Sequence, residues 1–173
     1  MTSHPIQLDI REATDADADA IVAILNPIIE ARIYSVFDTP FTGDEERAFI
    51  RGFPARGVFH VAVNRADDTV VGLQNVEPFA SYTRAFDHVG VIGTFVQLGL
   101  RRQGIATRLF EATLSAALTK GYEKLFTYVR ADNPVALQAY QRQGFRVVGT
   151  AEKHATIDGR YVDEIMIEKV LRA

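Results

Sequence analysis

A short run with two arginines and a glycine lies between residues 89–96, which are apolar and β-branched, and a segment with helical spacing of its apolar residues. A strand that leads through a glycine turn into a helix points several backbone N–H groups at one place, because the first N–H groups of a helix lack partners and the helix dipole is positive there. Gly104 lets the backbone approach an anion, and the arginines add charge. The run therefore predicts a phosphate-binding loop, while a plain turn beside a solvated charged face would use the same residues. The predicted loop contains Arg101, Arg102, Gln103, Gly104, Ile105, Ala106 and Thr107.

A second segment has the features of a short capped helix that carries a phenol. Asn133 followed by Pro134 is typical of a helix start, and Gly144 is typical of a helix end. Asn133 and Tyr140 are two turns apart and therefore project from nearly the same side. A phenol of ordinary pKa keeps its proton at neutral pH, so Tyr140 can serve as a general acid. The alternative is that the ring packs in the core and its hydroxyl bonds to a carbonyl.

Together the two segments resemble the acyl-CoA site of the GNAT N-acetyltransferase superfamily. The loop matches the superfamily pattern (Arg/Gln)-x-x-Gly-x-(Gly/Ala), and the spacing of Asn133, Tyr140 and 144–145 matches the helix after its fifth strand. Residues 10–17 resemble its usual opening, in which a strand leads into Ala-Thr-x-x-Asp and a helix.

The likeness extends to one branch of the superfamily. Asn26, Arg32 and the segment 37–40 look like the branch that contains phosphinothricin-type and amino-acid N-acetyltransferases. The resemblance spans nearly the whole chain, and it is specific for the CoA half and loose for the acceptor half.

This resemblance implies the activity and the donor side of the site. The expected reaction transfers the acetyl group of acetyl-CoA to a primary amine of a small molecule, amino-acid-like or xenobiotic, by direct attack in a ternary complex. The pantetheine arm would pair with Thr94, Phe95 and Val96 like an added strand, and Asn133 would contact the CoA arm. Tyr140 would protonate the leaving thiolate, and a backbone N–H of the strand would stabilise the oxyanion.

The general base has no direct match. In the resembled branch a glutamate often stands five positions before the residue matching Val96, and here that position is Val91, which cannot take a proton. Glu77, at the end of the preceding strand, is the first substitute. His88, just before residues 89–96, is the second, since an imidazole titrates in the right range. Both residues could instead be structural, as a strand-end surface charge and as a partner of Asp87.

Acceptor recognition is expected to use the first helix and two loops. Asn26 and Arg32 lie in or after that helix, and Phe79 and Tyr82 lie in the aromatic loop before residue 89. Loop aromatics often line pockets, and they also often close the end of a core. These residues do not name the acceptor.

Hydrophobic periodicity and turn residues predict the elements that position these residues. Helices are expected after the Thr14–Asp17 cap as far as residue 29, from residue 43 to before Pro54, and at 105–120 and 134–143. Strands are expected at 7–12, 58–64, 70–77, 89–96, 124–130, 145–152 and 161–171, with a hairpin turn at 157–160. The predicted fold is α/β (α+β): the GNAT fold, with a mixed, mostly antiparallel sheet of six to seven strands flanked by about four helices.

Composition limits the remaining classes. The 173 residues suit one domain over 1–173, and the net charge of -3 gives no broad basic surface for nucleic acid. The chain has no cysteine, and its four histidines have no zinc-site spacing, so no metal is expected. Residues 1–5 lack a signal-peptide layout and no apolar run could span a bilayer, which predicts a cytoplasmic protein without a membrane partner.

Two points stay open at this level. Apolar residues of the last strand, such as Ile165 and Ile167, permit a homodimer without requiring one. The alternatives to a small-molecule enzyme are a protein N-terminal or lysine acetyltransferase and a non-catalytic acyl-CoA sensor. Val91 at the glutamate position is the feature that favours the sensor.

Overall fold

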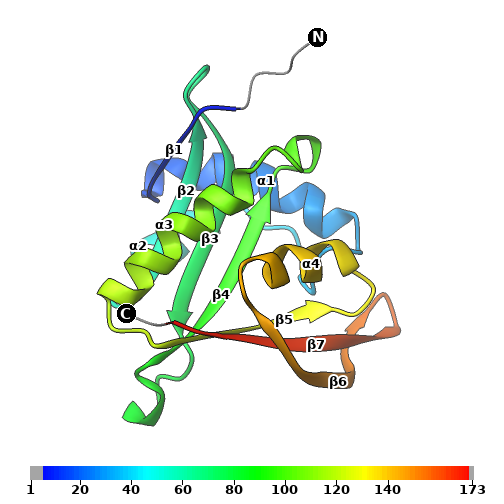
Figure 1. Ribbon diagram of the computed structural model, residues 1–173. Coiled ribbons are helices and arrows are strands. Elements are labelled where there is room, and N and C mark those ends of the chain that lie inside the picture. The colour runs from blue at the N-terminus through cyan, green and yellow to red at the C-terminus, as the bar shows by residue number, and fades with distance from the viewer. Residues whose placement is uncertain (1–5, 172–173) are drawn as a thin grey trace.

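The computed structural model describes residues 6–171 and contains one seven-stranded sheet with helices on both faces (Figure 1). The predicted mixed, mostly antiparallel sheet of six to seven strands with about four helices is confirmed, with seven strands and four α-helices in the described residues. The strands are β1 (Leu8–Glu12), β2 (Val58–Asn64), β3 (Thr69–Pro78), β4 (Val89–Val96), β5 (Lys124–Arg130), β6 (Arg146–Ile157) and β7 (Arg160–Val170). The helices are α1 (Ala18–Glu30), α2 (Gly43–Arg51), α3 (Ile105–Thr119) and α4 (Pro134–Arg142).

Two neighbouring strands of the sheet, β4 and β5, pair over only part of their length. The strand order is β1-β2-β3-β4-β5-β7-β6, and all neighbours are antiparallel except β4 and β5. Those two strands pair only over Val89–Val91 and Lys124–Phe126, and beyond this point they separate (Figure 1). The second half of β4 is therefore paired on its β3 side alone among the described strands.

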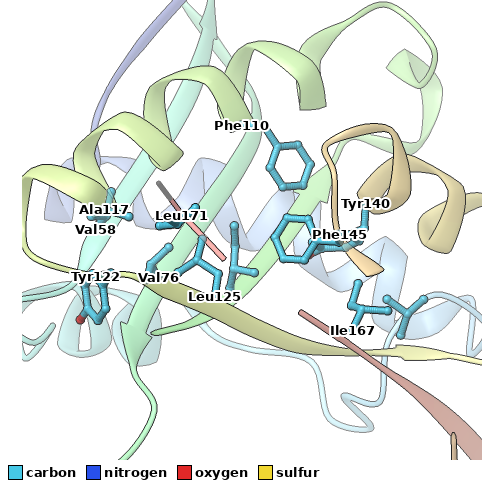
Figure 2. Close-up of a cluster of buried hydrophobic side chains, with 12 residues drawn as sticks. Val58, Val76, Phe110, Ala117, Tyr122, Leu125, Tyr140, Phe145, Ile167 and Leu171 are labelled. Atoms are coloured by element: carbon cyan, nitrogen blue, oxygen red, sulfur yellow. The ribbon is translucent and has the colours of Figure 1, made fainter. Parts of the chain in front are cut away.

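The helices cover the two faces of the sheet in different combinations. Helices α1 and α2 lie on one face, where the apolar stripe of α1 packs on Phe59, Val61 and Leu73. Helix α3 crosses the other face, where Ile105 and Leu109 pack on β1–β3. The core continues from α3 under α4, with Phe110 and Tyr140 close to Phe145 (Figure 2).

Local signals for the ends of these elements are confirmed in most places. The Thr14 N–H donates to the Asp17 carboxylate at 2.8 Å, as in a capping box, although a 3-10 turn at Asp15–Asp17 precedes α1. Gly144 has a φ of +83°, as expected where a helix ends in the left-handed region. Asp158 and Gly159 both have positive φ, as the predicted hairpin turn requires.

Three differences from the sequence-based expectations have physical causes. Strand β6 continues to Ile157, because register shifts let it follow β7 beyond residue 152. A 3-10 turn at Arg84–Phe86 lies within the expected loop. Ile167 is fully buried in the core and Ile165 is partly buried against it, so Ile167 adds nothing to the surface; the homodimer stays a prediction.

Residues 1–5, on which the absence of a signal peptide was argued, lie outside the described residues. Within residues 6–171, no helix has both the length and the apolar character needed to cross a membrane. In the same range, no three His, Asp or Glu side chains gather where they could hold a metal ion. One domain over 1–173 stays a prediction.

Candidate active site

Two cavities meet at the point where β4 and β5 separate. The first, here called the loop cavity, has a volume of about 730 Å³ and is lined by residues of 94–107 and of α4. The second, here called the aromatic cavity, has a volume of about 650 Å³ and is lined largely by residues of α2, β3, β4 and the loop between α1 and α2. The residues that line both are Tyr34, Thr94, Phe95, Ala136 and Tyr140. The two cavities therefore adjoin each other at Thr94 and Tyr140.

The predicted phosphate loop forms one wall of the loop cavity. Gly104 is the N-terminal cap residue of α3 with a φ of +82°, and the space that a Cβ would enter is open to 4 Å. The adjoining N–H groups of Ile105, Ala106 and Thr107 belong to the first turn of α3, where no earlier carbonyl of the helix can accept from them. This geometry suits an anion close to the backbone.

The other residues of the loop differ in where their side chains lie. Arg102 lines the loop cavity and has a φ of +64°. The Arg101 guanidinium lies 3.9 Å from the centroid of the Tyr34 ring, so it stacks on the loop after α1 as well as lining the cavity. Gln103 is exposed and does not line the cavity.

The open edge of β4 presents alternate backbone groups to the gap. Val89 accepts from Phe79 and Gln97 donates to Val71, so odd-numbered residues of β4 direct their N–H and C=O groups to β3. In an antiparallel ladder the residues between them direct theirs to the other side. The N–H groups of Thr94 and Val96 therefore point into the gap between β4 and β5, along the loop cavity.

Tyr140 is held at the junction by its ring and by its hydroxyl. The side chain is 7% exposed, and its ring lies 5.3 Å from that of Phe110 and 5.1 Å from that of Phe145, between centroids (Figure 2). Its hydroxyl is 2.9 Å from Thr94 Oγ1. Burial raises the pKa of Tyr140 to about 12, so the phenol keeps its proton throughout the neutral range.

Two further side chains fix this junction. The Gln74 side-chain amide donates to Thr94 Oγ1 at 2.8 Å, so the hydroxyl of Thr94 joins Gln74 to Tyr140. Asn133 caps α4 by accepting the Ala136 N–H at 3.2 Å, and its amide group donates to the Tyr34 carbonyl at 3.4 Å.

Comparison with known proteins identifies the family of this chain. The model of the acetyltransferase (GNAT) family matches residues 29–145, which span the loop, β4 and α4. This chain belongs to the GNAT acetyltransferase family. Its members transfer acyl groups from acyl-CoA to amines, and the predicted enzyme class is confirmed.

Relatives of known sequence and structure agree with this membership. A Bacillus subtilis (strain 168) protein, YwnH, named as a candidate phosphinothricin acetyltransferase, is 24% identical over 157 residues, which cover 90% of this chain and 94% of that protein. A GCN5-related N-acetyltransferase from Kribbella flavida is 27% identical with a TM-score of 0.82, over 95% of this chain and 98% of that one. A GNAT phosphinothricin acetyltransferase from Sinorhizobium meliloti, solved in complex with acetyl-CoA, has a TM-score of 0.87 at 18% identity, over 95% and 88%.

In this GNAT chain, Glu77 lines the aromatic cavity and His88 does not. Glu77 is the cross-strand partner of Val91, and its carboxylate accepts from the Asn75 amide at 3.0 Å. Burial raises the pKa of Glu77. The His88 side chain is exposed at the start of β4, and it lines neither of the two cavities. The geometry therefore retains only the first of the two predicted bases at the site.

The residues expected to recognise the acceptor lie outside the aromatic cavity. Asn26 accepts from the Phe41 N–H and donates to its carbonyl, both at 2.9 Å, so it holds the loop after α1. Arg32 donates to the Asp38 carbonyl at 2.6 Å within that loop. Phe79 packs on Phe86 and Phe126, and Tyr82 is 83% exposed. Asn26 and Arg32 therefore hold the loop that carries part of the cavity lining. None of the four residues lines the cavity itself.

Sequence reasoning missed two carboxyl groups that do line this cavity. Glu46 is 6% exposed, and burial raises its pKa to about 7. Glu164 is also buried, its pKa is raised by that burial, and its carboxylate lies 3.9 Å from His154 Nε2. A signal for Glu46 was present, since it precedes Phe49 and Ile50 by three and four positions and so shares their face of α2.

Proposed function

We propose that this enzyme transfers the acetyl group of acetyl-CoA to a primary amine of a small molecule, by direct attack in a ternary complex. The observation that carries the proposal is the meeting of the loop cavity and the aromatic cavity at Thr94 and Tyr140. Two substrates, one in each cavity, would bring their reacting atoms together at this junction, as direct transfer requires.

The residues of the loop cavity fit acetyl-CoA. The open space at Gly104 and the N–H groups at the start of α3 suit its pyrophosphate, and Arg102 adds positive charge. The outward N–H groups of Thr94 and Val96 suit the amides of its pantetheine arm, which would extend the sheet at β4. When bound, acetyl-CoA supplies the acetyl thioester.

We assign each remaining task of the reaction to a group that lines the two cavities. Glu77 takes the proton that the amine loses as its nitrogen bonds to the acetyl carbon. The N–H of Thr94 or Val96 donates to the carbonyl oxygen as its charge develops, and one such donor is typically worth roughly 2.7–4 kcal/mol. Tyr140 gives its proton to the sulfur as the carbon–sulfur bond breaks. Its raised pKa means that the phenol is protonated before this step.

Direct attack is also favoured by what the chain lacks. It contains no cysteine, so no thiolate can carry the acetyl group between the two substrates. Initial rates measured over both substrate concentrations should give intersecting lines. Parallel lines, or an acetylated protein in the mass spectrum after exposure to acetyl-CoA alone, would contradict direct transfer.

The function itself is tested by CoA release and product analysis with a panel of small amines and a panel of peptides. The expected result is acetyl-CoA-dependent release of CoA with small amines, and a product that carries one added acetyl group by mass spectrometry. Turnover confined to peptides with a free N-terminus or lysine would replace this proposal with protein acetylation.

A further inference from the structure

The charged side chains that line the aromatic cavity are almost all acidic. Four glutamates line it: Glu45, Glu46, Glu77 and Glu164. Among the described residues that line this cavity, Arg130 is the single basic one. The cavity wall therefore attracts a cation, unless Arg130 is free to receive an anion.

Four of the five N–H donors of Arg130 already have partners in the protein. Its Nε and Nη2 donate to the two carboxylate oxygens of Asp132 at 2.9 and 2.7 Å. Its Nη1 donates to the carbonyls of Arg32 and Ser35 at 2.8 and 3.0 Å. The side chain is 5% exposed, so it neutralises Asp132 and anchors the loop after α1. A carboxylate or phosphinate of an acceptor would find one N–H of Nη2 left, and to pair with the guanidinium at two points it would have to break one of these bonds.

Glu45 accepts two hydrogen bonds from Thr42 in the capping box of α2, and the other three glutamates lie in surroundings that disfavour their charge. Glu46 and Glu164 are buried and Glu77 is half-buried, and burial makes the ionised form of each less favourable. An ammonium group entering the cavity would relieve this cost, whereas a second anion would increase it. The wall thus selects by charge before any contact with the rest of the acceptor.

The rest of the cavity is apolar and rich in rings. The aromatic side chains that line it from the α2 side and from the sheet are Tyr34, Phe37, Phe41, Phe49, Phe59 and Phe95. Faces and edges of such rings pack best against an apolar or aromatic group. A volume of about 650 Å³ has room for a ring attached to an amine.

We propose that the acceptor is a primary amine on an apolar, aromatic body that carries no carboxylate or other acidic group. The inference rests on the proposed function, and it narrows the acceptor class of the same site. It separates this chain from an amino-acid acceptor, which would bring an α-carboxylate into a cavity without a free cation.

Three matched compounds test the inference: phenethylamine, phenylalaninamide and phenylalanine. They share the ring and the amine, and the last two differ in charge at nearly constant shape. CoA release should favour phenethylamine over phenylalanine by about 100-fold in kcat/KM, the order expected when a carboxylate is left without a partner. Phenylalaninamide should lie within about tenfold of phenethylamine, since a neutral amide keeps much of its hydrogen bonding. Calorimetry in the presence of CoA should give the same order for binding.

The outcomes separate the inference from the proposed function. Equal turnover of phenylalanine and phenethylamine would overturn the inference and leave the function intact. Equal rejection of phenylalaninamide and phenylalanine would assign the selection to size, and would overturn the charge argument. A preference for the aliphatic polycation spermidine over phenethylamine would overturn the aromatic part. Failure of every amine to release CoA would overturn the function, and the inference with it.

Variants of the cavity wall provide a second readout. Glu46→Gln keeps the size of the side chain and removes its charge, and it should reduce the preference for phenethylamine over phenylalanine about tenfold. Glu164→Gln is a second variant of the same kind. Glu123→Gln removes an exposed carboxylate outside the cavity and should leave the preference unchanged. An unchanged preference in both cavity variants would overturn selection by charge.

Discussion

Glu77 and Val91 are direct cross-strand partners on β3 and β4, so their side chains project from the same face of the sheet. Val91 occupies the position at which the phosphinothricin-type branch often has a glutamate. A carboxylate is therefore present beside the expected place, supplied by the neighbouring strand. The Asn75 amide, two residues earlier on β3, holds it by a hydrogen bond of 3.0 Å.

Glu77→Gln should lower kcat/KM and flatten the rising limb of its pH profile, because a carboxamide cannot accept the proton of the amine. The folded-state pKa of Glu77 is raised by burial, so the base ionises later on that limb than an exposed glutamate would. An acceptor amine of lower pKa shows which group causes the rising limb. The limb moves to lower pH if it reports the amine, and it stays in place if it reports the enzyme. His88→Asn should keep the profile of the parent.

Because the two positions are partners, a carboxylate at residue 91 should replace one at residue 77. Val91→Glu in the Glu77→Gln background should recover part of the lost rate, while Val91→Gln in the same background should not. Absence of any recovery, with both proteins folded, would mean that the base is elsewhere on the cavity wall.

Tyr140→Phe should reduce kcat by about 10²-fold, the usual contribution of a general acid, and leave acetyl-CoA affinity nearly unchanged because the ring still packs. The free energy of unfolding should fall by about 1 kcal/mol with the loss of the bond to Thr94. Tyr122→Phe is a matched control, since the Tyr122 hydroxyl is buried without a hydrogen-bond partner among residues 6–171, and Tyr122 lines neither cavity. If Tyr140→Phe retains the parent kcat, solvent protonates the thiolate.

Gly104→Val should weaken acetyl-CoA binding more than tenfold by calorimetry, since the side chain would enter the open space at the start of α3. Gly121→Val is the matched control at the other end of the same helix. Gly121 also has a positive φ, +87°, and open space at its Cβ. Both variants should lose similar stability from backbone strain, and only Gly104→Val should lose affinity. Equal acetyl-CoA affinity in the two variants would contradict the prediction that this loop binds the phosphate.

Glu46→Gln should raise the free energy of unfolding above that of the parent, and this gain should be larger at pH 8 than at pH 5. The pKa of Glu46 is about 7 in the folded protein, above its ordinary value, so the folded state binds the proton more tightly than the unfolded chain does. The free energy of unfolding of the parent therefore falls as the pH rises from about 4.5 to about 7. The variant lacks this loss, which is on the order of 2 kcal/mol. Urea denaturation at both pH values, with Glu123→Gln as the control, measures the difference.

Local sequence signals were sufficient for most of the fold and for the helix starts that carry the predicted donor side of the site. The β-branched runs at 58–64 and 89–96 form strands, and Gly104 and Asn133 both cap the helices that they were expected to start. These positions depend on backbone conformation and on neighbours in the chain, which the sequence carries directly.

The acceptor side depends on contacts between distant segments, and the sequence does not carry these directly. Whether Asn26 faces a ligand or a backbone was decided by the loop 15 residues later, which takes both of its hydrogen bonds. Glu46 is one of three acids in the first turn of α2, a position at which acidic residues are common on exposed helices. Its burial follows from the packing of α2 over the cavity, which no local pattern specifies.

The separation of β4 from β5 should make amide hydrogen exchange alternate along β4. In the free protein, water is the available partner of the Thr94 and Val96 amide hydrogens, whereas those of Gly93 and Phe95 are turned to β3. Exchange with deuterated water should thus alternate between fast and slow from one residue to the next along a single strand. If exchange slowed only at Thr94 and Val96, it would show that a ligand had filled the gap between β4 and β5.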